Sequence, residues 1–337
     1  MDGNLSYRTP EAIPRDQIEH WVKSILNEKQ MRIFEERLEC DMAVSVDGIG
    51  RFRVNVYRQR NLVNMAFRVI PSRIPTFEQL KLPPVIRKIA DEPRGLVLVT
   101  GTTGSGKTTT LAAMIDYINS TRGRHIITIE DPIEYLHEDK QSILSQRELE
   151  QDTLSFPEAL KHAVRQDPDV ILLGEMRDLE TVAAALTAAQ TGHLVLSTIH
   201  TIDAVQTVNR IIDVFPPHQQ NQIRFQLADT LRGVVSQRLL PHAGGVGRVP
   251  AVEVMVVTPI IRKYVLENTL GEITTMMKQG SYYGMQTFHQ ALVDLISRKE
   301  ISLETALEAS SNPEEIMMAI RGVQTGSENS GTFFQQT

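Results

Sequence analysis

Hydrophobic and polar residues alternate in two ways along the chain, and the change of pattern divides it into blocks. Near the N-terminus three segments alternate apolar and polar residues, as half-buried strands do, and they span 41–46, 50–57 and 63–70. A helical stretch from Arg15 to about Arg37 precedes them, and the glycines of 48–50 indicate a hairpin turn. Residues 1–70 therefore predict a small α+β domain with an antiparallel sheet.

A second pattern follows, in which short apolar runs alternate with amphipathic segments. The apolar runs span 95–100, 124–130, 170–173 and 193–198 and are typical of parallel strands buried on both faces. Helical spacing is found over 107–116, 156–166, 178–190 and 203–214. Alternation of strand and helix predicts a doubly wound α/β core with a mostly parallel sheet.

The remaining segments complete the domain organisation. Prolines at 71, 75, 83 and 84 predict a linker over 71–84, so the core is expected over 85–257. Residues 258–321 predict a helical C-terminal region that includes a helix over 285–297. The tail, 322–337, is rich in Gly, Ser, Asn, Thr and Gln, and this composition predicts disorder.

The most specific motif is the phosphate-loop pattern G-x-x-x-x-G-K-[ST], which lies between a predicted strand and a predicted helix. Its glycines let backbone N–H groups converge on phosphate oxygens, whereas a chance glycine-rich turn would not require this strand–loop–helix context. We expect Lys107 to neutralise the β- and γ-phosphates and the Thr108 hydroxyl to bind Mg²⁺. The predicted nucleotide-binding residues are Gly101, Thr102, Thr103, Gly104, Ser105, Gly106, Lys107, Thr108 and Thr109.

Hydrolysis also needs carboxylates, and two segments offer them. In the first, Glu130, Asp131 and Glu134 follow an apolar run, at the strand end where α/β sheets bind ligands. The alternative for this segment is an acidic surface turn. In the second, Glu175 follows the run 170–173 and is placed to reach Mg²⁺ directly or through water. The alternative for Glu175 is a cap on the helix that begins near Arg177.

Histidines and arginines supply two further candidates. His193 and His200 lie at opposite ends of one predicted strand, about 23 Å apart, so they cannot bind one metal ion together. We expect His200 to face the nucleotide, although it could instead be a structural histidine. The small domain carries an arginine cluster of Arg51, Arg53, Arg58, Arg60 and Arg68. These arginines either form a solvated sheet face or supply positive charge in trans to a transferring phosphoryl group.

Composition narrows the class of protein. The chain has 337 residues, a net charge of −6 and a single cysteine, Cys40. The acidic balance argues against a nucleic-acid partner, and one cysteine excludes an internal disulfide and suits a reducing cytoplasm. No apolar run reaches the roughly 18 residues of a membrane span, and the N-terminus lacks a signal pattern.

Several motifs in this order resemble the secretion ATPase superfamily, and within it the type IV pilus retraction (twitching motility) ATPases of the PilT/PilU kind. Residues 164–178 match the acidic-strand signature of that family, 129–134 resemble its aspartate box, and 192–201 its histidine box. Further matches lie at 50–53, 237–239 and 284–287. The resemblance thus covers nearly the whole of the chain before the tail.

The resemblance implies a RecA-like core, a PAS-like small domain and Mg²⁺-dependent ATP hydrolysis in a homohexameric ring, with each ATP held between one core and a neighbouring small domain. It implies that Glu134 orients or activates water, that Glu175 lies on the metal side and that His200 senses phosphate. The implied partners are an inner-membrane pilus platform protein and a paralogous pilus ATPase. The implied location is cytoplasmic and peripheral at the inner membrane, and the implied work is pilus retraction.

Two departures from the family pattern keep alternatives open. The chain opens inside the family's small domain, so we expect an initial helix and strand to be missing, with either a truncated start or a small sheet that is completed otherwise. The helix over 260–267 keeps only Ile261, Arg262 and Glu267 of the retraction-associated pattern. The alternatives are a pilus-extension or type II secretion ATPase, which usually carries a tetracysteine zinc insert, a hydrolysis-poor regulator of the retraction motor, and a DNA-translocating ATPase.

Overall fold

The computed structural model describes residues 7, 9, 11–71 and 73–322, and it forms two compact units. Among the described residues, the first unit contains those up to Ile74 together with Asp131–His137, and the second contains Pro75–Glu130 and those from Glu138 onward. The predicted disordered tail lies outside the described residues, except for Gly322.

The first unit is the predicted α+β domain. Its elements are α1 (Arg15–Ile25), α2 (Glu28–Arg37), β1 (Glu39–Val46), β2 (Gly50–Gln59) and β3 (Leu62–Ile70), and the strands form an antiparallel sheet in the order β1-β2-β3. The predicted helical stretch is two helices, because Asn27 starts a new one. Its side chain accepts from the N–H of Gln30, whose side chain accepts from the N–H of Asn27 in return.

The helices of this unit cover one face of its sheet. Val22 and Phe34 of the helices are buried with Val54 and Val56 of β2, and Cys40 is buried in the same cluster. Because side chains alternate along a strand, the odd-numbered residues of β2 point to the opposite face. This small core explains why the alternating pattern could be recognised in the sequence.

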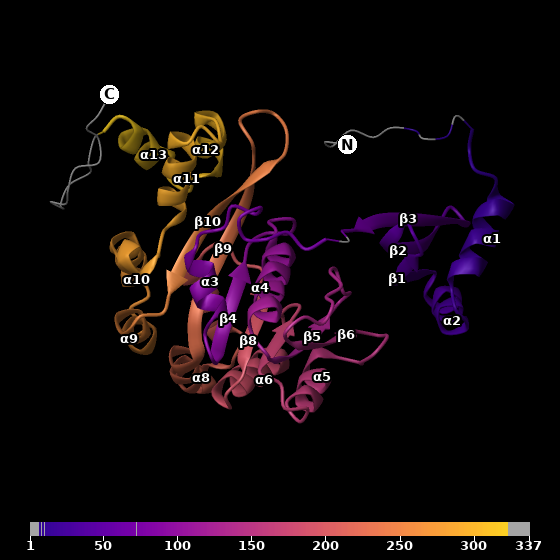
Figure 1. Cartoon of the computed structure of the whole chain (residues 1–337), viewed down its shortest axis with the longest axis horizontal. Helices are drawn as coiled ribbons and strands as arrows, with labels where there is room; N and C mark the ends of the chain where they lie inside the picture. Colours follow the sequence, from indigo (N-terminus) through magenta and orange to yellow (C-terminus); the bar gives the residue numbers. More distant parts are fainter. Residues whose placement is uncertain (1–6, 8, 10, 72, 323–337) are drawn as a thin grey trace. The chain divides into compact units, whose positions relative to one another are not determined.

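The second unit is built on a seven-stranded sheet within the described residues, in the order β10-β9-β4-β8-β7-β5-β6 (Figure 1). Its strands are β4 (Gly95–Thr100), β5 (His125–Glu130), β6 (Ile143–Glu148), β7 (Val170–Leu173), β8 (Leu194–Ile199), β9 (Leu231–Pro241) and β10 (Arg248–Val256). Every neighbouring pair is parallel except β9 and β10, which form a hairpin. The prediction of a doubly wound, mostly parallel core is confirmed.

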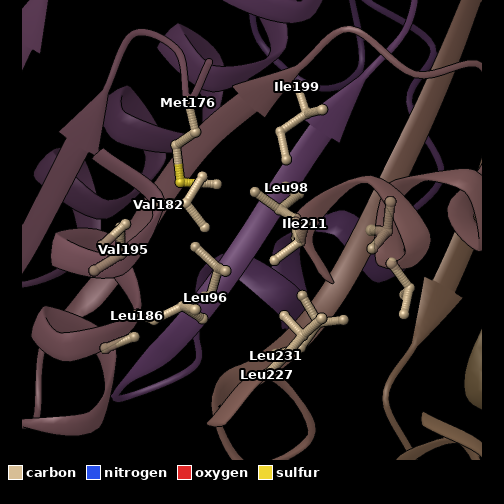
Figure 2. Close-up of a cluster of buried hydrophobic side chains, with 14 of the residues drawn as sticks. Leu96, Leu98, Met176, Val182, Leu186, Val195, Ile199, Ile211, Leu227 and Leu231 are labelled. Carbon is tan, nitrogen blue, oxygen red and sulfur yellow. The ribbon is translucent and has the colours of Figure 1, made fainter. Parts of the chain in front are cut away.

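Helices bury both faces of this sheet. They are α3 (Val85–Ala90), α4 (Lys107–Thr121), α5 (Phe156–Ala163), α6 (Leu179–Gln190), α7 (Ala204–Asp213) and α8 (Pro217–Thr230). Leu96 and Leu98 of β4 pack in one cluster with Val182 and Leu186 of α6, and Figure 2 shows these side chains gathered together. Val97 and Val99 alternate to the other face, where the cluster also holds Ile86 of α3 and Met114 of α4.

The C-terminal region is helical, as predicted, and packs on the β9–β10 hairpin. It contains α9 (Pro259–Glu267), α10 (Gly271–Gln279), the 3₁₀ turn η1 (Gly280–Tyr283), α11 (Phe288–Ser297), α12 (Leu303–Ala309) and α13 (Pro313–Ile320). The predicted helix over 285–297 is wrong at its start, because Gln286 pairs with Val254 of β10 instead. Across the described part of the chain, helices fall short of the length and apolarity that crossing a bilayer requires.

Candidate functional site

The phosphate loop, Gly101–Gly106, joins the end of β4 to the start of α4. Gly101, Gly104 and Gly106 have φ values of 142°, 79° and 91°, which lie in the region that side chains disfavour. A Cβ atom on Gly101 would lie 2.4 Å from the carbonyl oxygen of Gln237 and 2.4 Å from Ser105 Oγ. The glycine at this position is therefore required both by the backbone conformation and by close packing against β9.

Lys107 is buried inside this loop. Its Nζ donates to the carbonyl oxygens of Gly101 at 2.9 Å and Thr102 at 3.0 Å, and only 8% of the residue is exposed. The loop thus holds the ammonium group at the first turn of α4, where the positive end of the helix dipole also lies. This is the location that the sequence predicts for a phosphate-binding lysine.

Strand β9 supports the loop from one side. The Nε2 of Gln237 donates to Thr110 Oγ1 at 2.9 Å, and Thr100 Oγ1 donates to Ser236 Oγ at 2.9 Å, with all four residues buried. A cavity of about 290 Å³ opens beside the loop. Besides loop residues it is lined by Ile202, Gln237, Arg238, Leu239, Leu240 and Ala309.

Glu175 follows β7 and lies beside an arginine and a histidine side chain. Its carboxylate lies 2.7 Å from the Nε of Arg177 and 3.6 Å from the Nε2 of His200, and the Glu175 side chain is mostly buried. It does not cap α6. That role belongs to Asp178, which accepts from the N–H of Thr181 at 2.8 Å and from its hydroxyl at 2.7 Å. The cap alternative for Glu175 is therefore wrong.

The strand order brings these groups to one edge. β4, β8 and β7 are neighbours, and the phosphate loop, His200 and Glu175 follow their respective carboxyl ends. Parallel strands lie about 4.8 Å apart, so the three ends span about 10 Å. His193, by contrast, lies before β8 and bonds to the carbonyl oxygen of Ala188 at 2.8 Å, which is a structural role.

Two carboxylates at the same edge are buried, of which the sequence suggested Glu130 as a candidate but not Glu148. Glu130 ends β5 and Glu148 ends β6, they are partners in the parallel register, and each is only 6% exposed. Glu130 accepts from Thr128 Oγ1 at 2.7 Å and from Gln146 Nε2 at 3.3 Å. Glu130 had the same signal as Glu175, an acid after an apolar strand, whereas β6 is too polar to be recognised.

Glu134 belongs to the first unit, since Asp131–His137 groups with the small domain. Its neighbours in this segment, Ile133 and Tyr135, are buried, whereas Glu134 is half-buried. The structure therefore brings Lys107, Glu175 and His200 together in the core, and the catalytic role of Glu134 stays a prediction.

The predicted arginine cluster divides between the two faces of the small sheet. Arg53 lies directly opposite Arg68 in the β2–β3 register, and Arg51 shares their face by alternation. Arg58 lies on the helix-covered face, with its guanidinium 5.5 Å from the ring centroid of Phe34. Arg60 lies in the β2–β3 turn with φ 51°. The five arginines therefore do not all lie on one face of the small sheet, and a role in trans stays a prediction.

The donor set suits a metal ion that arrives with a nucleotide. Among the residues that the structure describes, no group of three or more His, Cys, Asp or Glu side chains could hold a metal. Mg²⁺ in phosphate sites usually takes one or two protein ligands and completes its shell with phosphate oxygens and water. The hydroxyl of Thr108 and the carboxylate of Glu175 are oxygen donors of this kind.

Comparison with known proteins agrees with this geometry. A Pseudomonas aeruginosa protein named "Type IV pilus retractation ATPase PilT" is 46% identical over 93% of this chain and 91% of its own length. A Neisseria gonorrhoeae "Twitching motility protein" is 46% identical over 94% of this chain and 84% of its own length. A crystal structure of the pilus retraction motor PilT with bound ADP, 47% identical, superposes with a TM-score of 0.88 over 94% of this chain and 91% of that one.

The family model described as "Type II/IV secretion system protein" matches residues 29–307. That match includes most of the small domain, the whole phosphate-loop core and the first C-terminal helices. The chain belongs to the type II/IV secretion system protein family.

Proposed function

We propose that this protein is an ATPase motor that powers retraction of type IV pili. The observation that carries the proposal is the phosphate loop, whose glycines adopt left-handed conformations around the buried Lys107. The relatives named for pilus retraction and twitching motility align with nearly the whole chain, which favours retraction over the other activities of the family.

The loop is suited to bind the phosphates of ATP. Its N–H groups lie at the start of α4, where the helix dipole favours negative charge, and Lys107 can exchange the carbonyls of Gly101 and Thr102 for phosphate oxygens. The buried hydroxyl of Ser105 has no hydrogen-bond partner among the described residues, which fits a loop whose polar groups are completed by a ligand. ADP bound to the related PilT structure supports the same assignment.

Hydrolysis then depends on charge placement around the γ-phosphate. Bound Mg²⁺ would neutralise phosphate charge, with Thr108 and Glu175 as its protein ligands. Glu134, four residues beyond the end of β5, would orient the attacking water, and His200 would sense the γ-phosphate through its contact with Glu175. Water adds to the γ-phosphorus while the bond to the β–γ bridging oxygen breaks, so the products are ADP and phosphate.

The active assembly would be a homohexameric ring in which a neighbour completes each site. Arg51, Arg53 and Arg68 share one face of the small sheet, and a paired Arg53 and Arg68 cost stability unless an anion approaches them. We expect the ring to work in the cytoplasm against an inner-membrane pilus platform protein, alone or with a paralogous pilus ATPase.

The test is steady-state ATPase activity, measured against protein concentration together with particle size. We expect activity to rise as rings form, and full activity in a monomer would contradict sites completed in trans. Glu134→Gln should retain ATP binding and lose turnover by about 10²-fold or more, as for a lost transition-state contact. Lys140→Ala is the control, because Lys140 pairs with Asp116 on the surface. Wild-type turnover in Glu134→Gln would remove Glu134 from the mechanism.

A further inference from the structure

One buried carboxylate joins the first residues of two helices, α7 and α11, that lie far apart in the sequence. Glu253 lies in the middle of β10 and is 7% exposed. Its Oε1 accepts from the N–H of Ala204, the first residue of α7, at 2.9 Å. Its Oε2 accepts from the N–H of Phe288, the first residue of α11, at 3.3 Å.

These two bonds are not needed to cap the helices. Asp203 caps α7 by accepting from the N–H of Gln206, and Thr287 caps α11 by accepting from the N–H of Gln290. Glu253 instead accepts from the N–H of the first residue of each helix, which neither cap residue binds. Because one carboxyl group accepts from both N–H groups, it holds the two helix starts close to each other.

The α7 side of this bridge leads to the nucleotide site. Ala204 lies directly after the segment 200–203, in which His200 contacts Glu175 and Ile202 lines the cavity beside the phosphate loop. The hydroxyl of Thr201 also bonds to that of Thr207 in α7 at 2.6 Å, with both residues buried. Segment 200–203 is therefore tied to the start of α7 by a buried hydrogen bond as well as by the chain itself.

The α11 side leads to the C-terminal helices. The guanidinium of Arg238 lies over the ring of Phe288, 4.2 Å from the ring centroid. Arg238 also donates a hydrogen bond to the carbonyl oxygen of Ala309, at the end of α12. Arg238 and Ala309 also line the cavity beside the phosphate loop. The start of α11 is thus connected to the nucleotide cavity by Arg238 as well as by Glu253.

The segment before α11 contains the sequence match at 284–287, and its contacts hold it against the core. Gly284 has φ 80°, and a Cβ atom there would lie 2.7 Å from the Cβ of Val85. Gln286 bonds through its backbone to Val254 and through its side chain to the carbonyl oxygen of Val252. Gln286 is therefore hydrogen-bonded to the residues of β10 on either side of Glu253. These bonds place the N–H of Phe288 close to the Glu253 carboxylate.

We propose that Glu253 is a positioning residue that couples nucleotide binding to the C-terminal helical region through the starts of α7 and α11. The proposal rests on the proposed nucleotide function. Coupling between two sites is reciprocal, so the same bridge lets a load on α11–α13 change the position of His200 and Glu175.

The test compares hydrogen exchange with and without ADP in the full chain, read separately at residues 200–207 and 288–292. Glu253→Gln keeps one acceptor and loses the other, and Glu253→Met removes both at similar volume. Asp169→Asn is the matched control, because Asp169 also accepts a backbone N–H, that of His125 at 2.9 Å, at the amino ends of β5 and β7. We expect ADP to slow exchange at 288–292 by about 5-fold or more in the wild type and in Asp169→Asn.

In both Glu253 variants the ADP effect at 288–292 should fall below about twofold, while the effect at 200–207 persists. The value of kcat should fall by about 10-fold, with KM for ATP nearly unchanged, because only the positioning of catalytic groups is lost. An unchanged ADP effect at 288–292 in folded Glu253→Gln overturns the proposal, as does a wild-type protein whose ADP effect stops at α7. Failure of the wild type to bind ADP would instead contradict the proposed function. If Glu253→Met does not fold, the result for Glu253→Gln alone decides whether Glu253 couples the two regions.

Discussion

The Nε2 of His200 lies 3.6 Å from the carboxylate of Glu175, although the two residues follow different strands. The contact exists because β7 and β8 are neighbours whose ends stay joined beyond the sheet. Thr198 Oγ1 donates to the carbonyl oxygen of Gly174 at 2.8 Å, and the N–H of Met176 donates to the carbonyl oxygen of Thr198 at 3.0 Å. An acid and an imidazole are therefore held together next to the phosphate loop.

This arrangement predicts that Glu175 affects catalysis and not folding. Glu175→Gln should lower turnover by about 10²-fold, as expected when a charged contact to the transition state is lost. Its melting temperature should stay within about 2 °C of the wild type, since the carboxylate caps no helix. ATPase assays and thermal denaturation of the same preparation measure both, and normal turnover would exclude Glu175 from the site.

Asp178, only three positions later, should behave in the opposite way. Burial acts to raise the pKa of its carboxyl, but the N–H and hydroxyl of Thr181 outweigh burial, and the pKa is lowered. A lowered pKa adds stability above the ordinary carboxyl pKa, and this stability is lost as the pH falls. Asp178→Ala should cost about 1 kcal/mol at neutral pH and less in acid, measured by denaturant unfolding at both values. An equal cost at both pH values would show that the carboxylate charge does not matter.

Much of the site was predictable from the sequence because its determinants are local. The phosphate loop needs glycines where φ is positive, and Gly101, Gly104 and Gly106 stand at those positions. Strand β4 is buried at every residue because helices cover both of its faces, and its central run 96–99 is wholly apolar. The same reasoning found Glu175, which follows an apolar strand.

Other features depend on contacts between segments far apart in the chain, and the local sequence pattern does not predict them. Strand β6 has few apolar residues because it lies at the edge of the sheet, so its pattern resembles a loop. Glu253 sits in an ordinary apolar strand pattern, and its two partners, Ala204 and Phe288, come from helices on opposite sides of it in the sequence. Arg58 and Arg53 look alike in the sequence, and only the pleat of β2 separates their faces.

Alanine should have different effects at two glycines of the phosphate loop, Gly101 and Gly104. Gly101→Ala places a methyl group 2.4 Å from a backbone carbonyl oxygen, which must shift. Gly104→Ala meets nothing within 4 Å and carries only the conformational cost of φ 79°, about 1 kcal/mol. We expect Gly101→Ala to lose more stability and nearly all ADP binding. Fluorescent-ADP titration and melting curves would refute this if both variants behaved alike.

Replacing an arginine on one face of the small sheet should stabilise the first unit, and replacing one on the other face should destabilise it. Arg68→Gln relieves the repulsion with Arg53 and should stabilise the first unit by about 0.2–1 kcal/mol while lowering ring ATPase activity. Arg58→Gln removes the contact with the ring of Phe34 and should cost about 0.5–1 kcal/mol. The fluorescence of Trp21 reports this unit, because the only tryptophan lies in α1. Loss of stability in Arg68→Gln would contradict the proposed repulsion.

Glu253 should make the stability of the core depend on pH. Burial raises the pKa of its carboxyl from 4.5 to about 7, and the N–H of Ala204 opposes the shift. The charged groups that act on it are Asp203, which raises the pKa further, and Arg238, which lowers it. At pH values between 4.5 and about 7, the Glu253 carboxyl keeps its proton in the folded state, whereas it has lost this proton in the unfolded chain.

Unfolding therefore releases a proton in this window, and rising pH favours the unfolded state. The stability that this protonation provides is fully present below about pH 4.5 and is lost as the pH passes about 7, a change of up to about 3 kcal/mol. Glu253→Gln cannot titrate, so the difference in unfolding free energy between wild type and variant should fall over this range and then level off. Urea unfolding followed by circular dichroism at several pH values measures this difference. A constant difference would mean that the Glu253 carboxyl titrates normally, and a difference that grows with pH would mean that its ionised form is the stabilised one.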